Sequence, residues 1–458
     1  MKKKLKGRDL IAMGYTQGKW FKTALEHANT YRLEGEDLTA FLDAAQPKLI
    51  EPYDKAVPFH RNIKAESELE ESNVASVVNT MYAVMKTPTV IDGAVMPDAC
   101  PTGPIGNIPV GGVVKTRDAI HPAMHSADIC CSVMMTNLGH VDPKTAMDAA
   151  HSITHFGGGG RKDHFELPEY LAKAMEKNRF FQDQRSMQLA KSHLGTQGDG
   201  NHFLYIGILE STGETVMVTH HGSRGLGANL YRQGMKLAER YRKEISPNTA
   251  KMNAWIPYCQ DDGKEYWEAL QLVREWTKLN HGVLHQATYA QLDREPVHQF
   301  WNEHNFVFRD GDDFYHAKGA TPLDAKFVPD AADGKRLVPL NMSEPILIVE
   351  GETTESNLGF SPHGAGRNMS RTAHKKTKEG KSIDAVFAEE TAGLDIRFFS
   401  GHIDISELPS AYKNAETVQA QMAEFGLGEV SDRILPYGSI MAGDWQVDAP
   451  WRKRRRRR

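Results

Sequence analysis

Residues 216–241 read VMVTHHGSRGLGANLYRQGMKLAERY, and this stretch decides the fold class. It begins with a run of apolar and β-branched residues, which is typical of a buried strand. The Gly-rich segment HGSRGLG then breaks the run. From Ala228 onward, apolar residues recur three and four positions apart, which predicts an amphipathic helix. A strand, a tight turn and a helix in succession indicate an α/β protein.

The rest of the chain repeats this mixture without a regular strand–helix–strand alternation and without an internal repeat. Residues 90–114 are rich in Gly, Pro and β-branched residues, so we expect short strands and tight turns there. The clearest amphipathic helix is expected from Tyr266 to Leu284. Helices are also expected at 67–85 and 165–192, and strands within 121–135, 193–209, 303–323, 336–351 and 433–443.

This pattern favours an α/β (α+β) fold with mixed sheets and flanking helices over a doubly wound sheet. We expect a single large domain over residues 49–445. Residues 1–48 have helical spacing broken by Gly14 and Gly18 and are expected to form a helical N-terminal segment. Residues 446–458 end in Arg452–Arg458 and are expected to form a disordered basic tail, which would either bind a polyanion or remain solvated without a specific role.

Composition limits the function classes. The chain has 458 residues, of which 25% are charged and 40% hydrophobic, and its formal net charge of −4 gives no global attraction to nucleic acid. Four cysteines, two of them adjacent (Cys130 and Cys131), are too few for a disulfide-stapled secreted protein. We find no secretory signal and no apolar run that approaches about 18 residues. These features favour the cytoplasm.

Candidate metal ligands are found at strand ends and in Gly-rich loops. A thiolate, several imidazoles and a carboxylate together suit a borderline metal such as Zn, Mn, Fe or Co. No spacing here is specific by itself, and each histidine taken singly is more often structural. His121, His125, His151 and His155 are spaced as plausibly as the candidates. The candidates are Asp128, Cys131, His202, His220 and His304.

A second chemical signal is SPHGAGRNMSR, residues 361–371. His363 is a candidate nucleophile for phosphorus, because a neutral imidazole beside a phosphate site can form a covalent intermediate. The small residues Gly364, Ala365 and Gly366 allow a ligand to approach the backbone. Arginine forks suit phosphate oxygens, and the candidates for phosphate or RNA binding are Arg224, Arg367 and Arg371. The alternative is a Gly-rich turn before a helix with solvated arginines.

Taken together, PDACPTGPIGNIPVGGV, ADICCSV, GDGNHF, HHGSRGLG, EHNFV, KGATP and SPHGAGRNMSR resemble, in order, the RtcB family of RNA ligases. The resemblance runs from about residue 90 to 443. It implies a large RtcB-like domain and a GTP- and Mn²⁺-dependent ligase that joins an RNA 3′-phosphate or 2′,3′-cyclic phosphate to a 5′-hydroxyl. Such an enzyme acts in RNA repair or tRNA splicing. Its partners would be RNA with such ends and a protein activator of the archease kind.

The resemblance also implies roles for individual residues. His363 matches the histidine that receives the nucleotide, and the five candidate ligands match those of a dinuclear manganese site. Residues that match the nucleotide pocket are Asn201, Phe203, Tyr205, Ser343, Gly364, Ala365 and Gly366.

This chain departs from the family pattern at several positions. Cys130 and Ser132 replace glycines, and Cys100 replaces a histidine on the expected RNA path. Tyr205 stands where the family has a glutamate that reads guanine, and Ala442 stands where it has a closing lysine. The loop 338–343 is also changed. We therefore expect the covalent and metal chemistry to be retained and the nucleotide preference to differ.

Two other functions are compatible with these residues. An RNA-end-binding homologue with little ligase activity would keep the metal site and bind RNA without forming an adduct. A metal-dependent phosphohydrolase would use His363 as an acid or base, so its turnover would survive His363→Ala.

Overall fold

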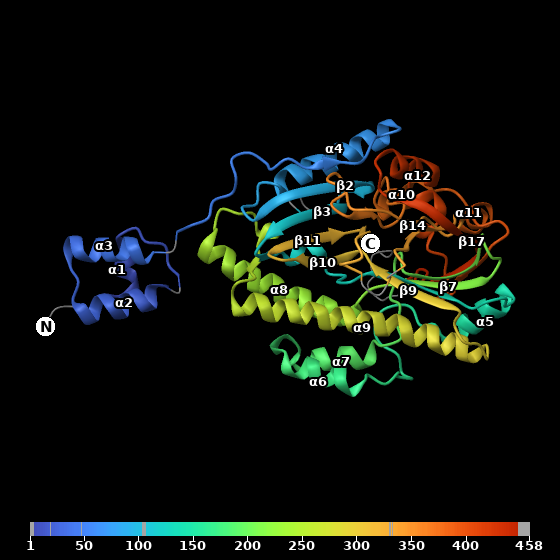
Figure 1. Cartoon of the computed structure of the whole chain (residues 1–458), viewed down its shortest axis with the longest axis horizontal. Helices are drawn as coiled ribbons and strands as arrows, with labels where there is room; N and C mark the ends of the chain where they lie inside the picture. Colours follow the sequence, from blue (N-terminus) through green and yellow to red (C-terminus); the bar gives the residue numbers. More distant parts are fainter. Residues whose placement is uncertain are drawn as a thin grey trace.

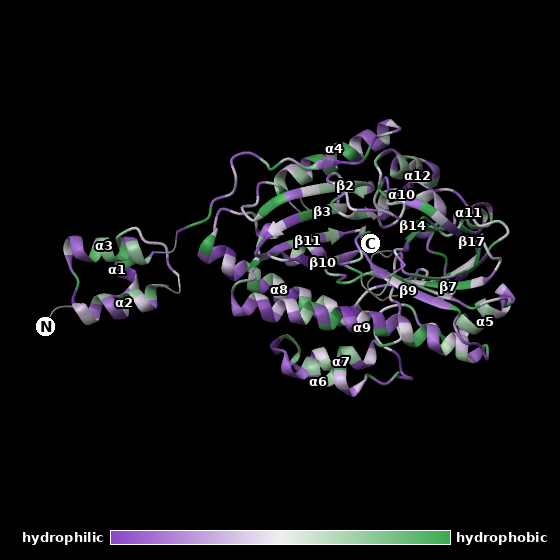
Figure 2. Ribbon diagram, viewed as in Figure 1, coloured by the Kyte–Doolittle hydropathy of each residue, from purple (hydrophilic) through white to green (hydrophobic). Residues whose placement is uncertain are grey.

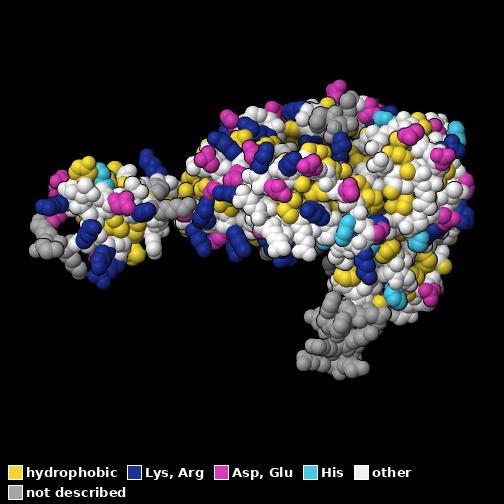
Figure 3. All heavy atoms as spheres, turned by 90° about the horizontal axis from the view of Figure 1, so that it is seen from below, with side chains coloured by type: hydrophobic (Ala, Val, Ile, Leu, Met, Phe, Trp, Pro, Cys, Tyr) yellow, Lys and Arg dark blue, Asp and Glu magenta, His cyan; other side chains and the backbone are white. Residues whose placement is uncertain are grey.

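The computed structural model describes residues 4–18, 20–46, 48–102, 107–328, 331 and 333–447. Residues 448–458 of the expected basic tail, including Arg452–Arg458, lie outside the described residues. Three short helices stand apart from a much larger body of sheets and helices (Figure 1). Lys and Arg side chains are spread over these helices and over the neighbouring end of the larger body (Figure 3).

The three N-terminal helices are α1 (Gly7–Ala12), α2 (Trp20–Tyr31) and α3 (Gly35–Ala45). They lie within the segment for which helical spacing is predicted. Their apolar faces meet in a small core of their own, formed by Leu10, Phe21, Ala24, Ala28, Leu38 and Leu42 with Tyr15. Residues 48–59 then connect them to β1 (His60–Arg61) without forming a helix or strand.

The larger sheet contains eight strands. Seven follow the order β13-β14-β17-β6-β7-β5-β9, and β16 pairs in parallel with β17. Neighbouring strands along the seven-strand path are antiparallel. The bounds are β5 (Ser132–Asn137), β6 (Phe203–Leu209), β7 (Thr215–His221), β9 (His298–Glu303), β13 (Arg336–Pro339), β14 (Ile346–Glu350), β16 (Asp395–Phe398) and β17 (Glu429–Met441).

A second sheet has the order β1-β2-β3-β11-β10. Its strands are β1, β2 (Val90–Cys100), β3 (Val110–Arg117), β11 (Asp313–Lys318) and β10 (Asn305–Asp310). Two small pairs complete the strands: β12 (Ala320–Pro322) with β15 (Phe360–Pro362), and β4 (Ala119–Ile120) with β8 (Ile256–Pro257). Both parallel and antiparallel pairs occur, so the predicted mixed α/β class is confirmed.

The prediction of only short strands over 90–114 is wrong at β2, which runs for 11 residues. Gly93 lies within the strand and pairs with Val114 on β3. Its missing side chain leaves room for Met85, since a Cβ there would lie 2.9 Å from Met85 Sδ. Pro97 is tolerated because the register between β2 and β3 shifts between Val95 and Cys100. The strand therefore continues to the residues that enter the site.

The longest helix, α9 (Asp261–Gln291), supports the larger sheet. Its buried residues recur at helical spacing, from Tyr266 through Val273 and Trp276 to Leu284. Hydrophilic and hydrophobic residues accordingly alternate along it (Figure 2). Further along, His281 and His285 share the hydroxyl of Thr219 on β7, at 2.6 and 2.7 Å. The helix thus fixes the sheet from behind with both apolar and polar contacts.

The remaining helices surround the two sheets (Figure 1). Several begin at a capping side chain; the Ser67 hydroxyl, for example, accepts a hydrogen bond from the backbone N–H of Glu70. In the part of the chain that the structure describes, no helix is long and apolar enough to cross a membrane. These helices are α4 (Glu68–Val84), α5 (Pro143–Ile153), α6 (Glu169–Lys177), α7 (Gln184–Ser192), α8 (Arg224–Ile245), α10 (Arg371–Thr377), α11 (Ile383–Glu390) and α12 (Ala415–Glu424).

Candidate active site

Four neighbouring strands of the larger sheet, β6, β7, β5 and β9, bring the five predicted ligands together at the same end of these strands. Because β6, β7, β5 and β9 are antiparallel in that order, the first residues of β5 and β6 lie beside the last residues of β7 and β9. His220 on β7 pairs with Phe203 on one side and Val133 on the other. Asp128 and Cys131 come before β5, His202 comes before β6, and His304 follows β9.

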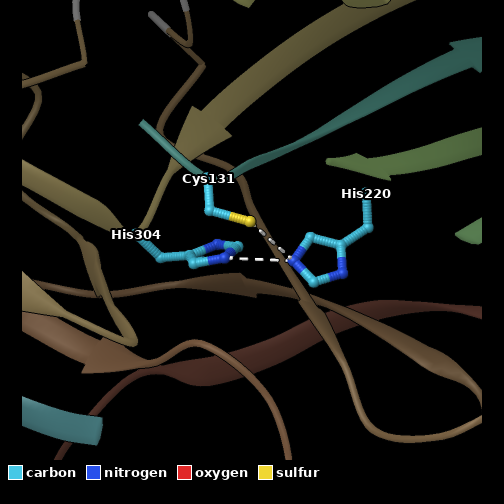
Figure 4. A group of neighbouring side chains, drawn as sticks. All are labelled: Cys131, His220 and His304. Carbon is cyan, nitrogen blue, oxygen red and sulfur yellow. Dashed lines mark hydrogen bonds between the residues drawn. The ribbon is translucent and has the colours of Figure 1, made fainter. Parts of the chain in front are cut away.

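The five side chains form two groups that share the Cys131 sulfur. Cys131 Sγ lies 3.5 Å from His202 Nε2 and 3.3 Å from His220 Nε2. Asp128 Oδ2 lies 3.1 Å from His202 Nε2, and His304 Nε2 lies 3.2 Å from His220 Nε2. Figure 4 shows Cys131, His220 and His304 pointing toward one another. Within each group all the potential ligand atoms lie within 4.8 Å of one another. We call these five residues the ligand cluster.

Backbone carbonyls orient two of the imidazoles. His202 Nδ1 lies 2.7 Å from the Gln197 carbonyl, and His220 Nδ1 lies 3.1 Å from the Asn201 carbonyl. A carbonyl only accepts, so each Nδ1 carries the proton and each Nε2 presents its lone pair to the cluster. Burial lowers the pKa of His220 to about 3, so this ring is neutral near pH 7. A neutral imidazole with a free Nε2 is the form that binds a metal.

The electrostatics of the cluster also fit a cation. Burial raises the pKa of the Cys131 thiol well above its ordinary value, and the charge of Asp128 raises it further. Burial also opposes ionisation of Asp128, but the nearby His202 outweighs it and leaves the pKa of this carboxyl below its ordinary value. A buried thiolate beside a carboxylate is stable only with a positive charge close by. The donor set therefore fits one or two divalent metal ions of the borderline class.

The competing histidines do not join this cluster. His121 is buried against Thr89, and His125 is buried against Tyr266. His151 is exposed, and His155 is not in either ligand group. Cys130, the neighbour of a ligand, packs instead in the main hydrophobic core.

His363 lies beside the ligand cluster and is held by a carboxylate. It directly follows β15, and its ring centroid is 4.9 Å from that of His304. Its Nδ1 lies 2.5 Å from Asp98 Oδ2, and its backbone N–H donates to the same oxygen at 3.2 Å. Asp98 is fully buried near the end of β2. A carboxylate on Nδ1 keeps the proton there and leaves the Nε2 lone pair for reaction.

Lys413 and Gly366 fix this pair of residues. The Lys413 ammonium donates to the carbonyls of Pro97 and Ala99, on either side of Asp98, at 2.8 and 2.9 Å. The Lys413 backbone N–H donates to the Gly366 carbonyl. Gly366 has a φ of +71°, and a Cβ there would lie 2.0 Å from the Asp98 carbonyl oxygen. The loop after His363 therefore requires glycine at this position.

A cavity of about 620 Å³ opens over His363 and the ligand cluster. Its size suits a nucleotide or another ligand of several hundred daltons. The predicted residues that line it are Asn201, Phe203, Tyr205, His363, Gly364, Ala365, Gly366, Arg367 and Arg371, together with Asp128, Cys131, His220 and His304.

Both arginines of the 361–371 stretch share one carboxylate. Arg367 and Arg371 bind opposite oxygens of the buried Glu407, at 2.5 and 2.7 Å. The Arg367 guanidinium also lies over the Tyr412 ring, 4.6 Å from its centroid. The cavity is also lined by Lys318, whose ammonium donates to Thr102 and to the Ile108 carbonyl. Burial lowers the pKa of Lys318 to about 8. Three cationic residues, Lys318, Arg367 and Arg371, thus line the cavity.

Two predicted residues lie elsewhere. The Arg224 guanidinium donates to the Gly157 carbonyl and to Thr196, and Arg224 is not among the described residues that line the cavity. Its side chain fixes the loops before β6. Ser343 binds Asn341 Oδ1 through its hydroxyl and its backbone N–H, and it is likewise outside the lining.

Sequence reasoning missed Asp98, Lys318 and Glu407. Asp98 lies in the quoted motif PDACPTGPIGNIPVGGV, and Lys318 lies in the quoted motif KGATP. Their positions in these motifs could have marked both residues as site candidates. Glu407 has no comparable local signal, because its role arises from contacts with residues 36 and 40 positions away.

The chain is similar in sequence to known proteins over more than half of its length. A family model described as "tRNA-splicing ligase RtcB" matches residues 145–442. Proteins named "tRNA-splicing ligase RtcB" are also similar: 25% identity over 300 residues in Pyrococcus furiosus, 28% over 298 in Aeropyrum pernix and 23% over 294 in Thermococcus kodakarensis. Each match covers 56% of this chain. It covers 30%, 60% and 61% of those relatives, respectively, so the chain spans less than two thirds of their length. The family match begins after Asp128 and Cys131, whose place in the cluster therefore rests on geometry.

Proposed function

This chain belongs to the tRNA-splicing ligase RtcB family, and from this premise we propose that it is an RNA ligase that uses His363 as a nucleotidyl carrier. The proposed substrates are GTP, an RNA 3′-phosphate or 2′,3′-cyclic phosphate, and an RNA 5′-hydroxyl. The observation that carries the proposal is the placement of His363, with Nδ1 on Asp98 and its ring 4.9 Å from His304 of the ligand cluster.

In the first proposed step, His363 Nε2 attacks the α-phosphorus of GTP. A P–N bond forms and the P–O bond to pyrophosphate breaks. The proton stays on His363 Nδ1 throughout. The Asp98 carboxylate accepts its hydrogen bond and stabilises the positive charge that develops on the ring. Lys318 and Arg367, which both line the cavity, neutralise phosphate oxygens.

In the second step, a terminal oxygen of the RNA 3′-phosphate attacks the histidine-bound phosphorus. The P–N bond breaks, His363 leaves as a neutral imidazole, and the RNA carries an activated diphosphate end. In the third step, the 5′-hydroxyl attacks the phosphorus at the RNA 3′ end; a P–O bond forms, the P–O bond to GMP breaks, and the hydroxyl proton passes to solvent. A cyclic phosphate requires hydrolysis to the 3′-phosphate before the second step.

The ligand cluster is the proposed site of two divalent ions, Mn²⁺ in the first instance. Asp128, Cys131 and His202 would hold one ion, and Cys131, His220 and His304 the other. When bound, such ions polarise phosphoryl oxygens and offset charge in the transition state.

The test uses the full chain loaded with Mn²⁺ and incubated with GTP labelled at the α-phosphate. A denaturing gel should show an acid-labile label on the wild type and none on His363→Ala. His402→Ala, which removes an exposed histidine outside the cavity, is the matched control and should label normally. Absence of label from the metal-loaded wild type with every nucleotide tried would contradict the proposal. Such a result combined with RNA binding would favour an end-binding protein, whereas turnover by His363→Ala would favour a hydrolase.

A further inference from the structure

A patch of aromatic side chains lies exposed near the end of the described chain. Phe399 is 40% exposed, and Trp445 is 38% exposed. Both pack against one loop: the Phe399 ring centroid is 5.6 Å from that of His155, and a Cβ on Gly158 would lie 2.8 Å from Trp445 Cη2. Neighbouring exposed rings, unlike scattered ones, indicate a binding surface. We call His155, Phe399 and Trp445 the aromatic patch.

Hydrogen bonds fix the rings of the aromatic patch in place. The Phe399 backbone N–H donates at 2.8 Å to the carbonyl of Met441, four residues before Trp445. The Trp445 indole N–H donates to Asp199 Oδ2 at 3.0 Å. The polar atom of the indole is therefore satisfied by the protein, and its exposed ring surface is left for stacking.

The aromatic patch begins at the mouth of the cavity. Asp199, which holds Trp445, is followed by Gly200, and a Cβ on Gly200 would lie 2.7 Å from Arg371 Nη2. Arg371 lines the cavity, and its side chain is 51% exposed. The three residues of the aromatic patch are not among the described residues that line the cavity. A polymer that leaves the cavity past Arg371 therefore reaches the aromatic patch next.

Beside the aromatic patch the backbone itself is exposed. Residues 158–160 are three successive exposed glycines. They lie between Gly157, whose N–H donates to the Gly198 carbonyl, and Arg161, whose N–H donates to the Ser192 carbonyl. In the part of the chain that the structure describes, the N–H groups of these three glycines donate no hydrogen bond. Successive unpaired N–H groups suit a phosphate oxygen. We call residues 158–160 the glycine loop.

The two features together match the two parts of a nucleotide in a strand. Exposed flat rings suit the face of a base, and unpaired N–H groups suit the phosphate that joins it to its neighbour. In an RNA duplex the base faces are stacked on one another, so an unpaired strand is needed to present them. Every base has such a face, so a surface of this kind does not select a sequence.

We propose that the aromatic patch and the glycine loop bind single-stranded RNA, with bases stacked on Trp445 and Phe399. The bound strand is the one whose 3′-phosphate enters the cavity past Arg371. This inference rests on the proposed function for the substrate and for the direction of the strand. It adds a contact with the nucleotides before the reacting end, outside the cavity.

The test measures binding of a 5′-labelled single-stranded RNA with a 3′-phosphate to the Mn²⁺-loaded full chain, by fluorescence anisotropy and without GTP. Trp445→Ala should weaken binding by about 5- to 150-fold, the range for the loss of a stacked base. Trp445→Phe, which keeps a ring, should recover most of this loss. Tyr170→Ala removes an exposed ring on α6; it is the matched control and should bind as the wild type does. Equal affinity of Trp445→Ala and the wild type would overturn the inference and assign the aromatic patch to a protein partner.

An abasic nucleotide, placed in turn at each of the three positions before the 3′ end, locates the contact. At one position, loss of the base should weaken binding to the wild type but not weaken binding to Trp445→Ala further. Additive losses at all three positions, or coupling confined to the 5′ end of the RNA, would contradict the proposed path.

Salt dependence separates stacking from an effect of charge. The factor lost in Trp445→Ala should be the same at about 50 and 200 mM salt, because stacking releases no counterions. A factor that disappears at the higher salt would show an electrostatic contact and overturn the assignment of stacking.

These outcomes are separate from those that test the proposed function. A wild type that binds RNA but forms no adduct on His363 contradicts the proposed function and leaves this inference standing. A wild type that forms the adduct but does not bind single-stranded RNA overturns this inference alone. Metal content and Tm of Trp445→Ala should match the wild type. If this variant does not fold, Phe399→Ala takes its place, and unchanged RNA affinity in Phe399→Ala would refute the inference.

Discussion

Replacing Asp98 by Asn should slow nucleotide transfer to His363 strongly while metal and nucleotide still bind. The Asp98 carboxylate is fully buried, and its hydrogen bond to His363 Nδ1 measures 2.5 Å. Asn has the same shape and keeps an oxygen acceptor, so the change removes mainly the negative charge. Hydrogen bonds to charged groups contribute about 1.5–3 kcal/mol. If this stabilisation appears only as the ring becomes positive, the rate falls by about 10- to 160-fold.

The assay is the single-turnover rate of labelling with α-labelled GTP at saturating nucleotide, together with metal content and nucleotide affinity for each variant. Asp92→Asn is the matched control, because Asp92 lies on the same strand and also pairs with a histidine, His60, at 3.6 Å. That variant should label at the wild-type rate. A rate for Asp98→Asn within twofold of the wild type, or equal slowing of both variants, would refute the assigned role of Asp98.

Three further outcomes are expected. Cys131→Ser should lose both metal ions by elemental analysis, because both ligand groups share this thiol, whereas Cys130→Ser, in the hydrophobic core, should keep both. Burial lowers the pKa of Lys318 to about 8, so its ammonium is charged below pH 8 and neutral above it. Nucleotide affinity should therefore fall as the pH rises through 8 in the wild type and stay level in Lys318→Arg, measured by dialysis across the range. Deletion of residues 1–46 should leave the labelling rate unchanged and the Tm within about 3 °C, since α1–α3 have their own core; a larger loss in calorimetry would show that these helices stabilise the rest.

The local pattern of apolar and polar residues was sufficient to predict much of the fold. The strand, turn and helix of 216–241 and the helix around Val273 depend on periodicities of two and 3.6 residues, which the sequence displays directly. Even there, helical spacing at 266–284 marks only the central part of α9, which runs from Asp261 to Gln291.

The ligand cluster could be predicted as a set of chemical types at strand ends, but its geometry depends on strand order. Nothing local indicates that β6, β7, β5 and β9 are neighbours in that order. The pairing of Asp98 with His363 joins residues 265 positions apart, so no periodic pattern predicts it. Arg224 shows the converse: the sequence predicts that it binds phosphate or RNA, whereas its guanidinium donates a hydrogen bond to the Gly157 carbonyl.

Glu407 has a consequence for how a phosphate would associate with this protein. The Glu407 carboxylate forms ion pairs with both Arg367 and Arg371. An incoming phosphate would therefore have to displace Glu407 from the two arginines. Glu407 would keep the guanidinium groups oriented in the absence of ligand, and only the difference between the two anionic partners would contribute to affinity. A ligand with a single negative charge should therefore compete less well with Glu407 for these arginines than a doubly charged terminal phosphate does. Under the proposed function, Glu407 would therefore compete with weakly charged anions for both arginines, and its return to them would favour release of the product.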